Sequence, residues 1–182
     1  LGTVTSYNDA DCTHVYAIAG TYTMKIVGTC ETFVVNNGGT MKPVLTKVLK
    51  WGNVGMKSLN LNGCSKLTVL PSDTDGGLAL SDSFNNTFSN CTSLSSIPVD
   101  LFKFATGATT FSQTFFGCTG LTSLPVDLFK YNTEATSFQY CFNTASISSI
   151  PTDLFRYNTR VTSFSGTFRM CYELSSIATD LF

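Results

Sequence analysis

Two stretches of this 182-residue chain are near copies of each other, LTSLPVDLFKYNTEATSF at 121–138 and ISSIPTDLFRYNTRVTSF at 147–164. The Pro, Asp, Leu and Phe positions are retained, whereas Lys130 is replaced by Arg156 and Glu134 by Arg160. Similarity at a fixed interval indicates a stack of like structural units. We therefore predict that the retained side chains face inward and that the changed ones face solvent.

The repeat extends on both sides of these copies, with a spacing of 27 residues that shortens by one between Phe142 and Ile147. Each copy holds too few large apolar side chains to close a core alone, which predicts a solenoid stabilised by contacts between neighbouring coils. Its aromatic positions form three columns: Phe84, Phe111, Phe138 and Phe164; Phe88, Phe115, Phe142 and Phe168; and Phe102, Phe129 and Phe155.

Within a coil, the pattern predicts two short strands and two short helical turns. The segment 121–124 suits a strand that Pro125 ends, and 135–138 suits a second one. Asp127 is placed to cap a helical segment at 128–132, and Phe138 and Phe142 have helical spacing. The expected fold class is therefore α/β, a solenoid of 26–27-residue coils behind a small N-terminal all-β hairpin or cap.

Six of the seven cysteines bear on this arrangement. Cys64, Cys91, Cys118 and Cys171 recur at the repeat spacing, with Ala145 in the same column, which favours a column of small buried side chains over a disulfide framework. Cys12 and Cys30 flank the N-terminal hairpin and either bond to each other or are unrelated thiols. With a single His and no CxxC pair, no zinc site is expected.

The composition argues against nucleic-acid binding and against membrane insertion. Charged residues make up 13% and the net charge is −1, so no nucleic-acid partner is expected. No apolar run is long enough for membrane insertion. The low charge and the abundance of small polar residues are typical of extracellular or virion-surface proteins. The chain opens without Met and stops in mid-repeat, so we expect it to be part of a longer protein.

A catalytic or metal site is not indicated by any motif, and no cofactor is expected. The strongest candidate ligands are the carboxylates of one column, Asp100, Asp127, Asp153 and Asp180. Stacked carboxylates bind calcium in some proteins, but each of these precedes an apolar segment, so the capping interpretation is favoured.

A partner-binding face is predicted where an aromatic column and a basic column run side by side. Exposed aromatic side chains suit recognition, although these rings equally suit a role in covering the inner Phe102 column. The basic side chains are expected first of all to be a solvated face. A contact with an acidic patch on a partner is the second interpretation. The six positions are Lys103, Phe104, Lys130, Tyr131, Arg156 and Tyr157.

The segments FGCTGLTSLPVDLF and SNCTSLSSIPVDLF resemble the BspA-like leucine-rich repeats of bacterial surface proteins. The resemblance covers about residues 59–182. It implies a secreted or cell-surface adhesion protein, with a protein or glycan partner on a host or neighbouring cell. The Asn ladder of other leucine-rich repeats is expected to be absent, with Cys at the comparable inward position.

The N-terminal third differs from the repeats. The segment HVYAIAGTYTMKIVG at 14–28 resembles the last hairpin of a PKD-like, immunoglobulin-like domain. We predict a hairpin, partial domain or cap at 1–45 and a solenoid of about 4.5 repeats at 46–182, with Trp51 packing on the first coil. A capped first coil is what a solenoid requires.

These observations favour a non-enzymatic binding or adhesion module. Two alternatives stay open at this point: a phage or virion structural protein that oligomerises, and the repeat region of a larger secreted enzyme.

Overall fold

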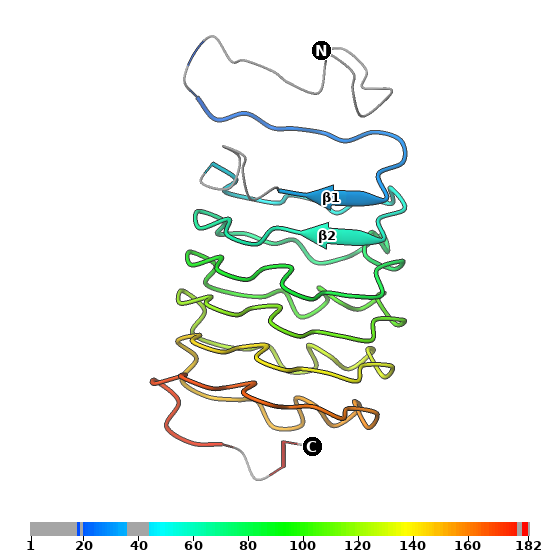
Figure 1. Cartoon of the computed structure of the whole chain (residues 1–182). Helices are drawn as coiled ribbons and strands as arrows, with labels where there is room; N and C mark the ends of the chain where they lie inside the picture. The colour runs from blue at the N-terminus through cyan, green and yellow to red at the C-terminus, as the bar shows by residue number, and fades with distance from the viewer. Residues whose placement is uncertain (1–17, 19, 36–43, 178–179, 182) are drawn as a thin grey trace.

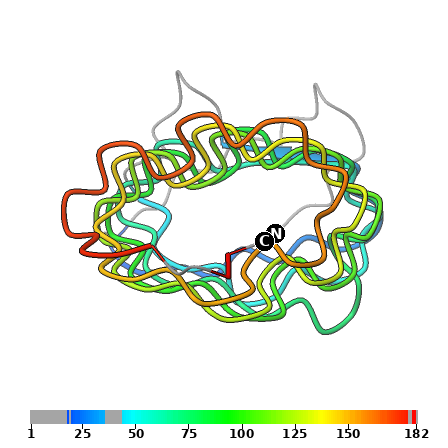
Figure 2. The same cartoon turned by 90° about the horizontal axis from the view of Figure 1, so that it is seen from below.

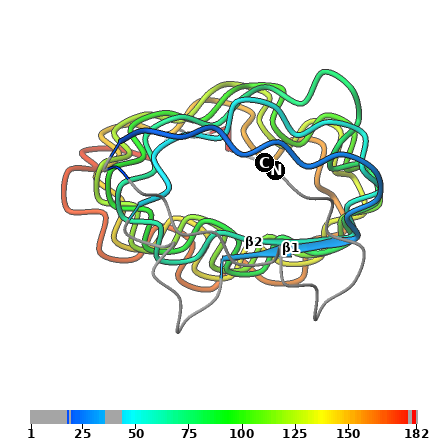
Figure 3. The same cartoon turned by 90° about the horizontal axis from the view of Figure 1, so that it is seen from above.

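The computed structural model describes residues 18, 20–35, 44–177 and 180–181. Its coils lie one below another in chain order (Figure 1), and seen along the stack they overlay as a flattened ring (Figures 2 and 3). Strand β1, Thr32–Val34, pairs in parallel with β2, Ser58–Asn60, in the register Phe33 to Leu59. The later coils are joined by isolated parallel bridges along the column of Ser83, Thr110, Ser137 and Ser163. The chain is therefore a solenoid of parallel coils.

The interior of the ring is filled by the three predicted phenylalanine columns. Phe115 stacks on Phe88 at a ring-centroid distance of 5.4 Å and on Phe142 at 5.6 Å, and Phe142 stacks on Phe168 at 5.6 Å. The other two columns stack at 5.3–5.9 Å. Because every coil places its rings in register with those of its neighbours, the core is continuous along the stack. This prediction from the repeat is confirmed.

The predicted helical turns are wrong, and so is the α/β class that included them. The strands predicted at 121–124 and 135–138 do not form either, and the second is reduced to the isolated bridge at Ser137. The described residues contain no helix, and β1 and β2 are their two strands. In the segment after Phe84, the Thr87 N–H donates to Phe84 O, but the Asn86 and Phe88 N–H groups donate to Ser112 O and Thr114 O of the next coil. An α-helix needs each of these donors for the carbonyl four residues earlier. Pairing between coils therefore replaces helix formation.

Left-handed backbone conformations reinforce this outcome. Asn86 and Asn90 have φ values of +59° and +58°, and the equivalent residues of later coils do the same. Asp127 and Asp153, predicted as helix caps, have φ values of +60° and +58°, whereas a capping residue adopts an extended backbone. A left-handed residue ends a right-handed helical turn, so these segments are successive tight turns.

Trp51 starts the aromatic core, and its predicted packing on the first coil is confirmed. Its side chain is buried, and its Nε1–H donates to Pro71 O at 3.0 Å. Its ring lies 6.3 Å from that of Phe88, much as the Phe102 ring lies 6.1 Å from that of Phe115. Gly77 makes room for it, because a Cβ there would lie 2.6 Å from the Trp51 Cβ.

The repeating cysteines are buried, as predicted, and they are thiols that bond to the backbone. Cys118 Sγ–H donates to Phe88 O at 3.1 Å, and Cys171 Sγ–H donates to Phe142 O at 3.1 Å. Cys141 lies elsewhere, in the column of buried Thr114 and Thr167. Cys12 and residues 14–17 and 19 lie outside the described residues. The rest of the predicted 14–28 hairpin is described and contains no strand, so the predicted hairpin does not form there.

Thiol labelling tests this burial. Burial raises the pKa of Cys118 to about 12 and also raises that of the Cys141 thiol. Since the thiolate is the reactive form, we expect iodoacetamide at pH 8 to leave Cys118 and Cys141 unmodified in the native protein and to alkylate both in urea. Cys30, which is partly exposed, is the internal reference in peptide mass spectrometry. Labelling of Cys118 as fast as that of Cys30 would contradict the buried column.

Candidate functional site

The predicted partner-binding residues lie on the outside of successive coils. Phe104, Tyr131 and Tyr157 are 38%, 45% and 41% exposed, whereas the aromatic residues two positions earlier are buried. Of the three basic side chains, Lys103 and Arg156 are exposed and Lys130 is half-buried. The structure thus places one exposed ring on each of three adjacent coils. We call these six residues the aromatic–cation column.

Each cation of this column lies against a ring. Lys103 Nζ is 5.7 Å from the centroid of Phe104, and Lys130 Nζ is 5.8 Å from that of Tyr157 on the following coil. The Arg156 guanidinium is 5.9 Å from the same ring. Contacts of this kind hold a flexible cation in place, so Tyr157 orders basic side chains from two coils.

The aspartate column supplies counter-charges to this surface. Lys130 Nζ lies 3.3 Å from Asp127 Oδ2, and Arg156 Nη1 lies 3.4 Å from Asp153 Oδ2. The hydrogen bond that Lys130 donates to Asp127 raises the pKa of Lys130. No cluster of three candidate metal ligands occurs within the residues that the structure describes. Each of these two carboxylates contacts the cation three residues later in the chain.

A second set of polar residues, which the sequence reasoning missed, ties the coils together from inside. Asn132 Nδ2 donates to Phe102 O at 3.0 Å and to Ala105 O at 2.8 Å. Asn158 Nδ2 repeats this one coil later, to Phe129 O at 3.1 Å and to Asn132 O at 2.9 Å. The Cys column lies inward as expected and bonds to the preceding coil, so this Asn ladder is a separate column that the sequence did not lead us to expect. Its signal in the sequence was the Tyr-Asn-Thr triplet, present at 131–133 and again at 157–159.

A short ladder of hydroxyls runs along the outer surface. Thr136 Oγ1 donates to Thr109 O at 3.0 Å, and Thr162 Oγ1 donates to Thr136 O at 3.2 Å. Arg160 and Glu134, the pair that differs between the two quoted stretches, form an ion pair between coils. Both features link one coil to the next and leave the surface of the stack polar. In the described parts of the chain, no helix is long and apolar enough to cross a bilayer.

Fold and surface together define a parallel-coil solenoid with an ordered outer column of rings and cations. No family model and no curated protein matches the chain. Among solved structures, it is similar to a leucine-rich repeat protein from Bacteroides ovatus, at 17% sequence identity and a TM-score of 0.43. The match covers 91% of this chain and 42% of that one, so the chain spans less than half the length of that protein. The BspA-like and PKD-like assignments stay predictions.

Proposed function

We propose that this chain is a non-catalytic interaction module, displayed outside the cell, that presents its aromatic–cation column to a protein partner. The observation that carries the proposal is the spacing of exposed rings on a stacked frame, one per coil at Phe104, Tyr131 and Tyr157. Tyr and Arg are enriched where proteins bind one another. Because the frame is held by a continuous core, the column needs little ordering on binding, which favours affinity.

Charge supports the same interpretation. Asp127 and Asp153 offset Lys130 and Arg156, so this part of the column is close to neutral, and affinity would come mainly from the rings. An extended segment lying along the stack would meet a ring at every coil. We further propose that the coils are BspA-like leucine-rich repeats, for which the support is the match of FGCTGLTSLPVDLF to that pattern.

A random-peptide display library panned on the whole chain tests this function. Recovered peptides should bind wild type and lose about tenfold or more in affinity to a Tyr131→Ala, Tyr157→Ala double variant, since truncated hot spots cost ~2 kcal/mol. Val126→Ala, which shortens an exposed apolar side chain outside the column, is the matched control and should bind normally. Failure to recover any peptide, or equal binding to the double variant, would refute the proposed interface.

Lys130→Glu supplies a variant with reversed charge and an intact fold. Because Lys130 contacts the exposed Asp127 and Tyr157 and no core side chain depends on it, we expect a thermal transition nearly unchanged from that of wild type. Circular dichroism measures it. A cooperative transition at a much lower temperature would place this column inside the fold and remove it as a binding face.

A further inference from the structure

The repeat is broken at one point, and the surface of the solenoid is recessed there. Between the Cys column and the Leu column, the other coils carry two residues, such as Thr119 and Gly120 or Tyr172 and Glu173. The shortened coil carries only Ser146, between Ala145 and Ile147. Insertions in single repeats map to one face of a solenoid, which is often the binding face, and here the change in length is a deletion beside Ala145, which replaces the cysteine of the buried column.

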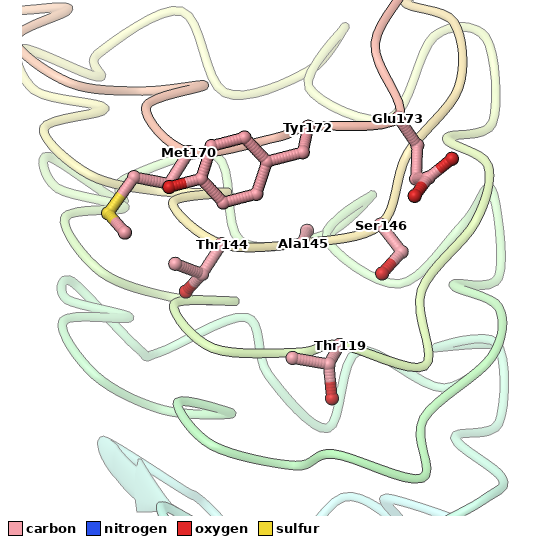
Figure 4. Close-up of a pocket in the computed structure, with 7 residues that line it drawn as sticks. All are labelled: Thr119, Thr144, Ala145, Ser146, Met170, Tyr172 and Glu173. Atoms are coloured by element: carbon pink, nitrogen blue, oxygen red, sulfur yellow. The ribbon is translucent and has the colours of Figure 1, made fainter.

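The missing residue leaves a depression of about 250 Å³, which we call the notch. Figure 4 shows Ala145 and Ser146 on the short coil, between Thr119 of the preceding coil and Tyr172 and Glu173 of the following one. A second depression of about 560 Å³ adjoins the notch, sharing Thr144 and Met170 with it. Volumes of about 300–1,000 Å³ are typical of small-molecule sites. The second depression is also lined by Gln113, Phe116, Tyr140, Asn143 and Arg169.

The backbone is strained where the two depressions meet. Thr144 and Met170 have φ values of +61° and +60°, in a column where the two preceding coils carry Asn90 and Gly117. Asn and Gly tolerate this conformation, whereas a β-branched or long side chain is disfavoured in it. Strain of this kind often accompanies a functional site. The chain thus accepts unfavourable residues only in the part of this column that borders the notch.

Tyr172 occupies a repeat position whose side chain faces solvent in the earlier coils as well. Its side chain is 82% exposed, and the equivalent Thr92 and Thr119 of earlier coils are exposed as well. Its ring is therefore a surface platform and not a core side chain. Tyr140 adds a second ring, which lies so close over Gly166 that a Cβ there would overlap it.

The lining chemistry favours a neutral, hydroxyl-rich ligand with an apolar face. Glu173 supplies the one carboxylate and Arg169 the one guanidinium among the residues of the two depressions, so no net charge selects an ion. The other polar groups are hydroxyls and amides, which both donate and accept hydrogen bonds. Flat rings beside such groups match the alternating C–H faces and hydroxyls of a sugar.

We propose that the notch and the adjoining depression form a binding site for a neutral oligosaccharide that runs parallel to the coils, across the solenoid axis, with one sugar unit against Tyr172. This site is separate from the aromatic–cation column, and it can exist whether or not that column binds a protein. Glu173, Ser146 and Thr119 are positioned around the notch to bond the hydroxyls of that unit.

Titration of the whole chain with a panel of neutral hexasaccharides tests the site, using cellohexaose, laminarihexaose, mannohexaose and xylohexaose with saturation-transfer NMR and calorimetry. We expect at least one to bind, with at least tenfold weaker binding to Tyr172→Ala. Thr92→Ala, in the same column of an unbroken coil, is the matched control and should not change the Kd. Hexagalacturonic acid and a lysine hexapeptide test for charged ligands.

Two further variants separate recognition from folding. Thr144→Gly should raise the melting temperature, because it relieves the left-handed strain, and should weaken sugar binding. A glycine inserted after Ser146 restores the 27-residue spacing and should abolish binding; if it fails to fold, Ser146→Ala takes its place with weaker binding expected. The proposal is overturned if no neutral hexasaccharide binds, if Tyr172→Ala leaves the Kd within twofold, or if only a charged probe binds.

Discussion

Replacing Phe115 with alanine is expected to lower the free energy of unfolding by about 3–5 kcal/mol. Phe115 is completely buried, and its ring stacks on those of Phe88 and Phe142 in the two neighbouring coils. It also contacts the ring of Phe102 in a second column, at a centroid distance of 6.1 Å. The substitution therefore leaves a cavity that no single coil can close, because the surrounding rings are fixed by their own neighbours.

Urea denaturation followed by circular dichroism measures this loss. The control is Phe104→Ala, since Phe104 is of the same residue type but partly exposed on the outer column, and it should cost much less. Because a solenoid is stabilised by contacts between neighbours, weakening a central coil is also expected to broaden the transition or to split it. A loss of less than about 1 kcal/mol for Phe115→Ala would contradict a core shared between coils.

The second large effect is expected for Asn132→Ala, at about 1–3 kcal/mol. The fully buried amide of Asn132 donates to Phe102 O and Ala105 O, and its loss removes both of these bonds, leaving each carbonyl with its main-chain donor alone, Ala105 N–H or Ala108 N–H. Each of the two lost hydrogen bonds contributes about 0.5–1.5 kcal/mol. Alanine is sterically acceptable here, because Ala105 holds the equivalent position one coil earlier, so the loss reports the hydrogen bonds more than the packing.

The same denaturation experiment measures this variant. Gln139→Ala removes an exposed amide from the same repeat and serves as the matched control, with little change expected. Asn158 donates to the main-chain O of Asn132, which alanine retains, so the losses of the two single variants should be close to additive in the double variant. Equal stability of Asn132→Ala and Gln139→Ala would show that the ladder is not a stabilising element.

The aromatic columns were predictable from sequence because a large apolar side chain kept at one spacing has to be buried. The same reasoning placed the cysteines inside and the Lys130 column outside, and the structure agrees on both. The Asn ladder was missed because Asn132 lies between polar residues, Tyr131 and Thr133, which suggests a surface turn. Only its two acceptors, carbonyls of the preceding coil, make a buried position tolerable.

The sequence shows that one residue is missing at the notch, but it does not show that a depression forms there. A deletion indicates where a coil is shorter, whereas the depression depends on what the coils on either side place next to the gap. Thr119 lies 27 residues before Ser146 and Tyr172 lies 26 after it, so the site is assembled only when three coils are stacked.

The spacing of like residues by itself determined that this chain is a stack of coils, and it determined which side chains form the core. It could not determine the backbone conformation within a coil. Each N–H can bond either to a carbonyl three or four residues back or to one about 26 residues away, and both options suit the same local sequence. The neighbouring coil settles the choice, because it offers acceptors such as Ser112 O and Thr114 O in register. Tertiary stacking therefore replaced the predicted helices with turns, and it brought the residues of each outer surface together.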